Sequence, residues 1–246
     1  MRLQKRPPIL SILFLISATY LHLSPQGRRA LDIYPPKGLK SAIKDAVYFS
    51  KNSTEALKRL TQVRSSVLQY WSEVNKLEVQ KYLTRGTLPF AIGIENISSL
   101  YGVINDLLDK IIMKDIQNSK SFDQQTLHSI KKILLVIADS NGALSVTKIT
   151  NFTGLQSKIT VQNVLDVLEE SELLLRIPPY GSNKSKVTKP SKYLFMTPIV
   201  RIALLGITGK VSTFNANMGK FLEDVAAVHF RRELEVSGLV TITYDP

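Results

Sequence analysis

The spacing of apolar residues along the chain predicts a largely helical protein. From Ser41 to about Val79, and again from Ile97 to Ile116, apolar residues recur three or four positions apart, as on one face of a helix. Within the first stretch, Ser53 or Thr54 followed by Glu55 has the chemistry of a helix start. The second stretch carries a wide apolar stripe typical of a packed core helix, made of Leu100, Val103, Ile104, Leu107, Leu108, Ile111 and Ile112.

Three shorter helices are expected next, and two strands follow them. Asp123 can cap the first helix, Ser145 begins the second, which ends at Gly154, and Ser157 begins the third. The segment LLLRIPPY predicts a strand, GSNKSKVTKPS a loop, and KYLFM a returning strand. Three helices followed by a two-stranded ribbon describe a winged helix, which is a variant of the helix-turn-helix.

The last part of the chain predicts one more helix, from Met218 to Leu234, and a final strand, GLVTITYDP. One helix and one strand cannot bury a core alone, so this end is expected to be incomplete. The inner face of the helix is predicted to consist of Phe221, Leu222, Val225, Ala226, Val228 and His229.

The beginning of the chain supports two incompatible interpretations. No charged residue occurs from Ile9 to Gln26, and basic residues lie just upstream, so residues 1–23 match the pattern of a secretory signal or membrane anchor. The apolar run of about 15 residues is short for a membrane span, which needs about 20. The same residues also suit a strand buried on both faces of a parallel sheet, leading into a loop with Arg28 and Arg29.

Composition narrows the candidate chemistry. The absence of cysteine excludes a disulfide framework and a thiolate metal site, and it favours the cytoplasm. The three histidines lie far apart in sequence, which argues against a histidine-based metal site. The net charge of +12 attracts partners that bear phosphate, such as nucleic acid, nucleotides or anionic lipid. Solubility alone accounts for this charge equally well.

The predicted winged helix supplies the candidate nucleic-acid residues. On the third helix, Lys158, Gln162 and Asn163 would face a major groove. The lysines of the loop would meet phosphates; they are Lys184, Lys186, Lys189 and Lys192. Acidic residues on the same helix would repel a phosphate backbone, namely Asp166, Glu169 and Glu170. DNA binding and docking within a protein therefore remain equal alternatives.

Other motifs are weaker. No G-x-x-x-x-G-K-[ST] loop exists in the sequence, so nothing cradles the phosphates of ATP. Arg28 or Arg29 could reach a γ-phosphate, or could lie in a solvated basic loop. Glu223 could join a metal-dependent nuclease site, which needs further acidic ligands, or could be a surface carboxylate.

The order of these segments resembles AAA-type P-loop ATPases of bacteria and archaea. The resemblance covers nearly the whole chain. It rests on ILFLISAT with LSPQGRRALDIYPPKGLKSAI, on KYLTRGTLPFAI and on IIMKDI, which holds Lys114-Asp115. It continues with SVTKITNFTGLQSKITVQNVLDVLEESELLLRIPPY, KYLFMTPIVRIALL and GKFLEDVAAVHFRREL. The family has a winged helix and closes with a domain of unknown function that is similar to PD-(D/E)xK nucleases.

The resemblance implies an α+β, mostly helical chain with four parts. These are a remnant of the ATPase sheet at 1–50, a helical lid at 51–120, the winged helix at 121–200 and the start of a nuclease-like α/β domain at 201–246. By position, Ser17 and Thr19 would lie on the sensor strand, and Arg28 or Arg29 would be the catalytic loop arginine. Full-length relatives would use ATP and Mg²⁺ to act on nucleic acid or a partner protein.

Departures from the family pattern weaken the expected chemistry. The phosphate-binding loop is missing, and I-S-A-T stands where the family has T-G-S-S. Thr197 and Pro198 replace an aspartate and a glycine, and the nuclease-like part ends before its acidic and lysine positions. We therefore expect a fragment or degenerate member that binds no ATP by itself and needs no cofactor. DNA or another protein is the expected partner, and a membrane is not.

Overall fold

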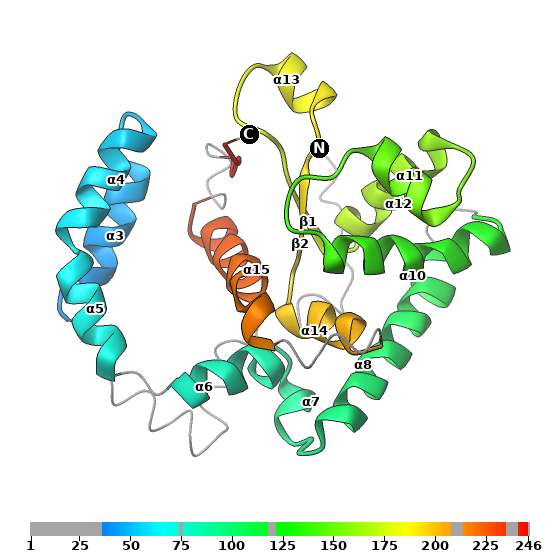
Figure 1. Cartoon of the computed structure of the whole chain (residues 1–246), viewed down its shortest axis with the longest axis horizontal. Helices are drawn as coiled ribbons and strands as arrows, with labels where there is room; N and C mark the ends of the chain where they lie inside the picture. The colour runs from blue at the N-terminus through cyan, green and yellow to red at the C-terminus, as the bar shows by residue number, and fades with distance from the viewer. Residues whose placement is uncertain (1–35, 74–75, 118–121, 208–213, 235–240, 246) are drawn as a thin grey trace, which may run out of the picture.

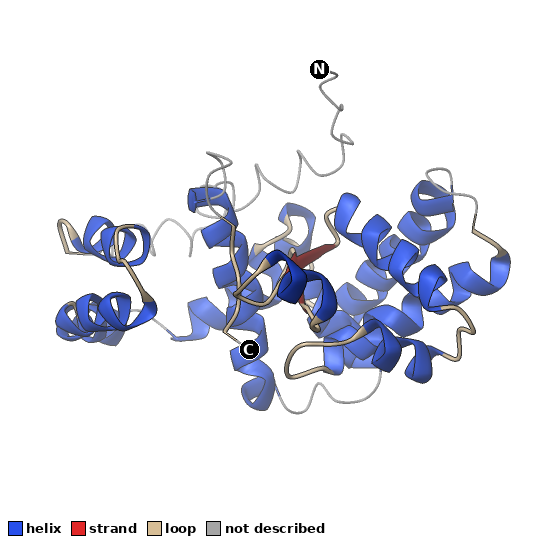
Figure 2. Ribbon diagram, turned by 90° about the horizontal axis from the view of Figure 1, so that it is seen from above, coloured by secondary structure: helices blue, strands red, loops and turns tan. Residues whose placement is uncertain are grey.

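The computed structural model describes residues 36–73, 76–117, 122–207, 214–234 and 241–245. These residues are mostly helical and contain one antiparallel two-stranded sheet, which confirms the expectation of a mostly helical α+β chain (Figure 2). The predicted sensor strand and arginine loop, with Ser17, Thr19, Arg28 and Arg29, lie outside the described residues. No helix of the described ranges combines the length and the apolar character needed to cross a bilayer.

The first three described helices form a helical arm, residues 39–73. They are α3 (Leu39–Tyr48), α4 (Ser53–Gln62) and α5 (Arg64–Glu73). Their substantial packing is with one another, and two perpendicular views show them apart from the other helices (Figures 1 and 2). The span predicted as helical from Ser41 to Val79 is divided into separate helices, and one of them begins at Ser53, where the sequence predicted a helix start. Asn52 interrupts the span, because its side chain accepts a 2.9 Å hydrogen bond from the Glu55 N–H and caps a new helix.

The next segment, residues 76–116, consists of five consecutive helical elements. They are α6 (Lys76–Lys81), the π-helical η1 (Tyr82–Gly86), α7 (Pro89–Ile92), α8 (Ile97–Lys110) and the π-helical η2 (Ile111–Ile116). The helical span predicted from Ile97 to Ile116 is confirmed, but its buried stripe is narrower than expected. Val103 and Leu107 are exposed, and the buried side chains form one row along the helix, made of Leu100, Ile104, Leu108 and Ile112.

A helix–ribbon unit, residues 123–196, follows in the predicted order. Its elements are α10 (Gln124–Asp139), α11 (Val146–Thr153), α12 (Lys158–Glu170), β1 (Leu174–Ile177), α13 (Asn183–Thr188) and β2 (Lys192–Phe195). The strands pair with Leu174 opposite Phe195 and Ile177 opposite Lys192. The predicted loop between them contains the short helix α13, which the Ser182 side chain caps.

The helix boundaries in this unit follow from local capping chemistry. Asp123 accepts a 2.6 Å hydrogen bond from the Thr126 N–H at the start of α10, which lowers the pKa of its carboxyl. Ser145 and Ser157 cap α11 and α12 in the same way. Gly154 ends α11 in a left-handed conformation at φ 73°, where a side chain would be strained. These predicted starts and stops are confirmed.

One hydrophobic core joins α8, α10, α11, α12 and both strands to α14 (Pro198–Ile207). Helix α14 packs against α8, α10 and α15 (Phe214–Leu234), and α15 lies beside the ribbon (Figure 1). The hydrophobic core thus contains residues from both sides of the domain boundaries predicted at residues 120 and 200. The predicted inner face of α15 is partly wrong, since Leu222 and His229 are exposed and Asp224 is fully buried. Within 241–245 the predicted last strand is reduced to one bridge, between Tyr244 and Pro179.

Candidate nucleic-acid interface

Helices α11 and α12 are joined by a tight turn, residues 154–157. Gly154 supplies the left-handed conformation, Leu155 is buried beneath the turn, and Ser157 caps α12. Two packed helices joined by a short turn that contains glycine form a helix-turn-helix arrangement. Ahead of it, the Leu144 N–H donates a 2.8 Å hydrogen bond to the Ser191 carbonyl, and the two residues form an isolated antiparallel bridge just before β2.

Helix α12 divides sharply into an inner and an outer side. The inner side is fully buried and consists of Val161, Val164, Leu165, Val167 and Leu168. On the outer side, Lys158, Ile159 and Asn163 are exposed and Gln162 is partly exposed. Because side chains four residues apart are neighbours on a helix, Lys158 lies beside Gln162 and Ile159 beside Asn163. The first two turns of α12 therefore present one compact outer face, which we call the α12 face.

The acidic residues of α12 lie outside this face or are paired. Asp166 accepts a 2.7 Å hydrogen bond from the Gln162 side-chain amide and lies 3.7 Å from the Arg176 guanidinium. Glu169 is half-buried, and burial raises the pKa of its carboxyl. Glu170 is exposed at the last position of the helix. The negative charge of α12, which would repel a DNA backbone, thus lies in the C-terminal half of the helix.

Three predicted lysines lie around α13, in the segment that we call the wing, residues 178–191. Lys184 and Lys189 are exposed and Lys186 is partly exposed. A cleft of about 230 Å³ separates the wing from the start of α11, and its lining includes Gln162, Arg176 and Lys189. Lys189 of the wing and Gln162 of the α12 face therefore border a common groove.

Lys192 has a different environment from the other candidate lysines. Its Nζ lies 2.6 Å from Glu223 Oε1 of α15 and 5.7 Å from the centre of the Tyr244 ring. The structure thus pairs a candidate nucleic-acid residue with the candidate nuclease residue. Among the described residues, no three side chains of the metal-binding types are grouped, so Glu223 has no companion ligands there.

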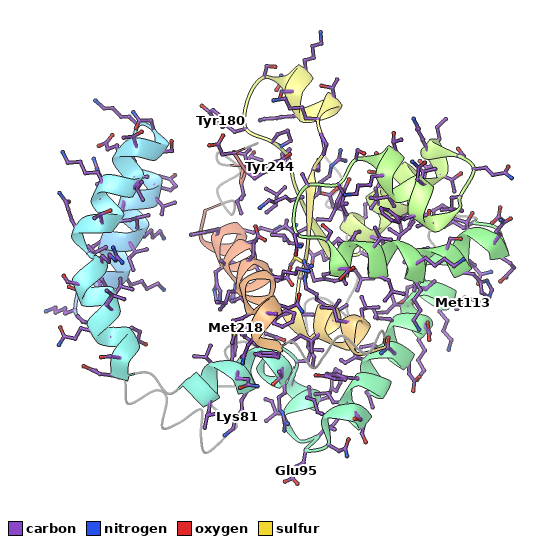
Figure 3. All side chains as sticks on the ribbon, viewed as in Figure 1. Lys81, Glu95, Met113, Tyr180, Met218 and Tyr244 are labelled. Carbon is purple, nitrogen blue, oxygen red and sulfur yellow. The ribbon has the colours of Figure 1, made fainter. Side chains whose placement is uncertain are left out.

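Tyr244 fastens the two ends of the wing, a contact that sequence analysis missed. Its N–H donates to the Pro178 carbonyl at 3.1 Å, and its carbonyl accepts from the Tyr180 N–H at 2.7 Å. Its hydroxyl donates to the Pro190 carbonyl at 2.6 Å. The two labelled tyrosines lie close together below α13 (Figure 3). The alternation in GLVTITYDP signalled a strand, but nothing local identified the wing as its partner.

A domain of unknown function (DUF8612) matches residues 76–211 of this chain, which is more than half of its length. The chain belongs to this family. The match begins at α6 and extends past α14, so the DUF8612 region contains the whole helix–ribbon unit and leaves out the helical arm.

A relative extends the comparison beyond the DUF8612 region. The uncharacterized protein MJ1637 of Methanocaldococcus jannaschii is 33% identical over 242 residues. The alignment covers 94% of this chain and 49% of MJ1637, so the chain spans about half the length of the curated relative it matches. No solved structure matches the chain significantly.

In this DUF8612 protein, the structure places most of the residues predicted for nucleic-acid binding on two surfaces, the α12 face and the wing. Lys158, Gln162 and Asn163 share the α12 face, and Lys184, Lys186 and Lys189 share the wing. Two residues close to these surfaces were not predicted from the sequence. Ile159 is an apolar residue on the outer side of α12, and Arg176 lies within a predicted strand.

Proposed function

We propose that the helix–ribbon unit is a winged helix that binds duplex DNA. The observation that carries this proposal is the α12 face, which is exposed beside a lysine-bearing wing in the order α10, Leu144, α11, α12, β1, α13, β2. In a helix-turn-helix, the N-terminal residues of the second helix contact base edges. Lys158, Gln162 and Asn163 occupy those positions in α12.

The distribution of charge supports the same function. Lysine contacts with phosphate hold a protein in register on the duplex, and the wing supplies Lys184, Lys186 and Lys189 for this role. Asp166, the acidic residue nearest to the α12 face, is neutralised by Arg176. The net charge of +12 adds a general attraction to the DNA backbone.

We also propose that this DNA-binding unit works within an AAA-type ATPase, in agreement with the resemblance of the ordered segments. The greater length of MJ1637 leaves room for a catalytic half in such a protein. The present sequence offers no G-x-x-x-x-G-K-[ST] loop to hold the phosphates of ATP. We therefore assign no step of ATP hydrolysis to this chain and expect the 246-residue protein to bind DNA without nucleotide.

Fluorescence anisotropy with a labelled duplex tests the DNA-binding proposal. We expect binding at about 50 mM salt, with an affinity that falls as salt rises. Replacing Lys184, Lys186 and Lys189 together by Gln should reduce the slope of log K against log salt by about 0.9 for each phosphate contact removed. Absence of binding at low salt contradicts the proposal.

A matched control separates a local contact from net charge. Replacing Lys37, Lys51 and Lys58 of the chain's N-terminal part by Gln removes the same charge from exposed positions outside the helix–ribbon unit. This variant should keep the wild-type salt slope. An equal change in both variants would show that the wing makes no specific phosphate contact. Nucleotide titration provides the second test, and micromolar ATP binding by the isolated chain would contradict its catalytic inactivity.

A further inference from the structure

We infer that the α12 face selects A·T base pairs in the major groove, with Ile159 against the thymine methyl group and Asn163 against adenine. This inference rests on the proposed DNA binding and adds a sequence preference to it. Thymine is the base that presents a methyl group in the major groove, and apolar side chains contact it there. Asparagine is suited to adenine, because its amide can bond N6 and N7 together.

The exposure of Ile159 is the first observation. Its side chain is 73% exposed, the highest value among the large apolar residues that the structure describes. It occupies the second position of α12, next to Lys158 and one helical turn before Asn163. An isoleucine gains nothing from facing water, whereas burying its surface against a methyl group is favourable. The position fits a contact with the groove floor.

The free amide of Asn163 is the second observation. Asn163 is exposed, and within the described part of the chain its side chain makes no hydrogen bond, so both its donor and its acceptor remain available. Ile159 and Asn163 lie four residues apart on the same side of the helix, which lets them contact neighbouring base pairs. A methyl contact from Ile159 beside an adenine contact from Asn163 would select two neighbouring A·T pairs.

Gln162 is held in place by a supporting network. Its Nε2 donates to Asp166 at 2.7 Å, and Asp166 is held in turn by Arg176. The amide carbonyl oxygen of Gln162 is then the group left to accept a hydrogen bond, which adenine N6 can donate. Asp166 and Arg176 are thus positioning residues for the α12 face.

Selection from a pool of random duplexes tests the inference with the whole chain. Duplexes retained by the wild-type protein should be enriched in a short run of A·T pairs, and Asn163→Ala should lose this enrichment. On an enriched duplex, replacing the contacted thymine by deoxyuridine should weaken binding about fourfold, the effect of one buried methyl group. Replacing Asn163 by Ala should reduce the preference for the contacted adenine by about 5- to 150-fold.

Variants at Ile159 separate base contact from non-specific binding. Ile159→Ala should bind thymine and deoxyuridine duplexes equally, whereas Ile159→Val should keep the difference. Unchanged thermal unfolding of both variants excludes a folding defect, because this side chain is exposed.

The outcomes distinguish the inference from the proposed function. Wild-type binding to duplexes without any A·T enrichment, or equal binding of thymine and deoxyuridine duplexes, overturns base selection while DNA binding stands. Identical behaviour of Ile159→Ala and the wild type on every duplex also overturns it and leaves Ile159 to a protein contact. Failure of the wild type to bind any duplex overturns the proposed function and this inference together.

Discussion

A single buried ion pair connects four elements of the core. Arg201 of α14 donates through Nε and Nη2 to the two oxygens of Asp224 on α15, at 2.7 and 2.8 Å. Its Nη1 donates to the carbonyls of Ile137 and Ala138 at the end of α10. The Phe195 N–H of β2 completes the shell of Asp224 at 2.9 Å. Burial raises the pKa of Asp224, and these contacts with Arg201 and Phe195 oppose the rise.

Removing one partner of this pair should destabilise the fold strongly. Asp224→Ala leaves the Arg201 guanidinium buried without its counter-ion, and we expect the free energy of unfolding to fall by about 3–5 kcal/mol. Glu223→Ala is the matched control at the adjacent position. Its ion pair with Lys192 is partly exposed, so its loss should cost no more than about 1 kcal/mol. Urea denaturation measures both changes, and similar losses for the two variants would show that the buried pair has no special role.

At the scale of elements, the sequence predicts what local chemistry determines. Ser145, Gly154 and Ser157 mark helix ends through interactions with residues a few positions away, so their roles could be predicted from the sequence. The same holds for the ribbon, whose two mainly apolar strand segments flank a loop that contains Gly181, Ser182 and Pro190. Contacts between residues far apart in the sequence could not be predicted in this way. Asp224 joins Arg201 across 23 positions, and in sequence it is one acidic residue beside another.

The candidate surface shows the same limit. Helical periodicity was enough to select Lys158, Gln162 and Asn163 as outward residues. It could not show that Arg176 of β1 neutralises Asp166, because that contact depends on how the strand packs against α12. Nor could charge alone show that Lys192, unlike the wing lysines, is paired with Glu223.

The wing and the chain's last described residues should behave as one element. Tyr244→Ala removes the hydroxyl that bonds the Pro190 carbonyl and the ring that lies near Lys192. Because one net hydrogen bond contributes about 0.5–1.5 kcal/mol, amides of the wing should exchange about 2- to 13-fold faster. Hydrogen exchange with mass spectrometry measures this change. Tyr180→Ala is the control, since its bond to Tyr244 uses the backbone N–H and its side chain is exposed. Equal exchange rates in wild type and Tyr244→Ala would show that the Tyr244 side chain does not stabilise the wing.

At the scale of the whole molecule, the helical arm and the core differ in how they are stabilised. The main hydrophobic cluster contains no residue of the arm, and none of the ten residues of α4 is buried. Phe49, Leu57 and Leu68 of this region are exposed. The DUF8612 match begins at residue 76, immediately after the arm and the two residues that follow it. The N-terminal boundary of the family match therefore coincides with the limit of the packed core.

Removal of the arm should leave the core intact. A chain that begins at Lys76 retains α6 to α15 and every residue of the main cluster, so amides in α10 and α14 should keep their full protection from hydrogen exchange. In the 246-residue chain, amides of α3 to α5 should exchange far faster than these, because few apolar contacts hold them. A chain that begins at Pro36 separates the effect of the arm from that of the residues before it. Loss of protection in α10 or α14 in the chain that begins at Lys76, but not in the chain that begins at Pro36, would show that the arm is a structural part of the core.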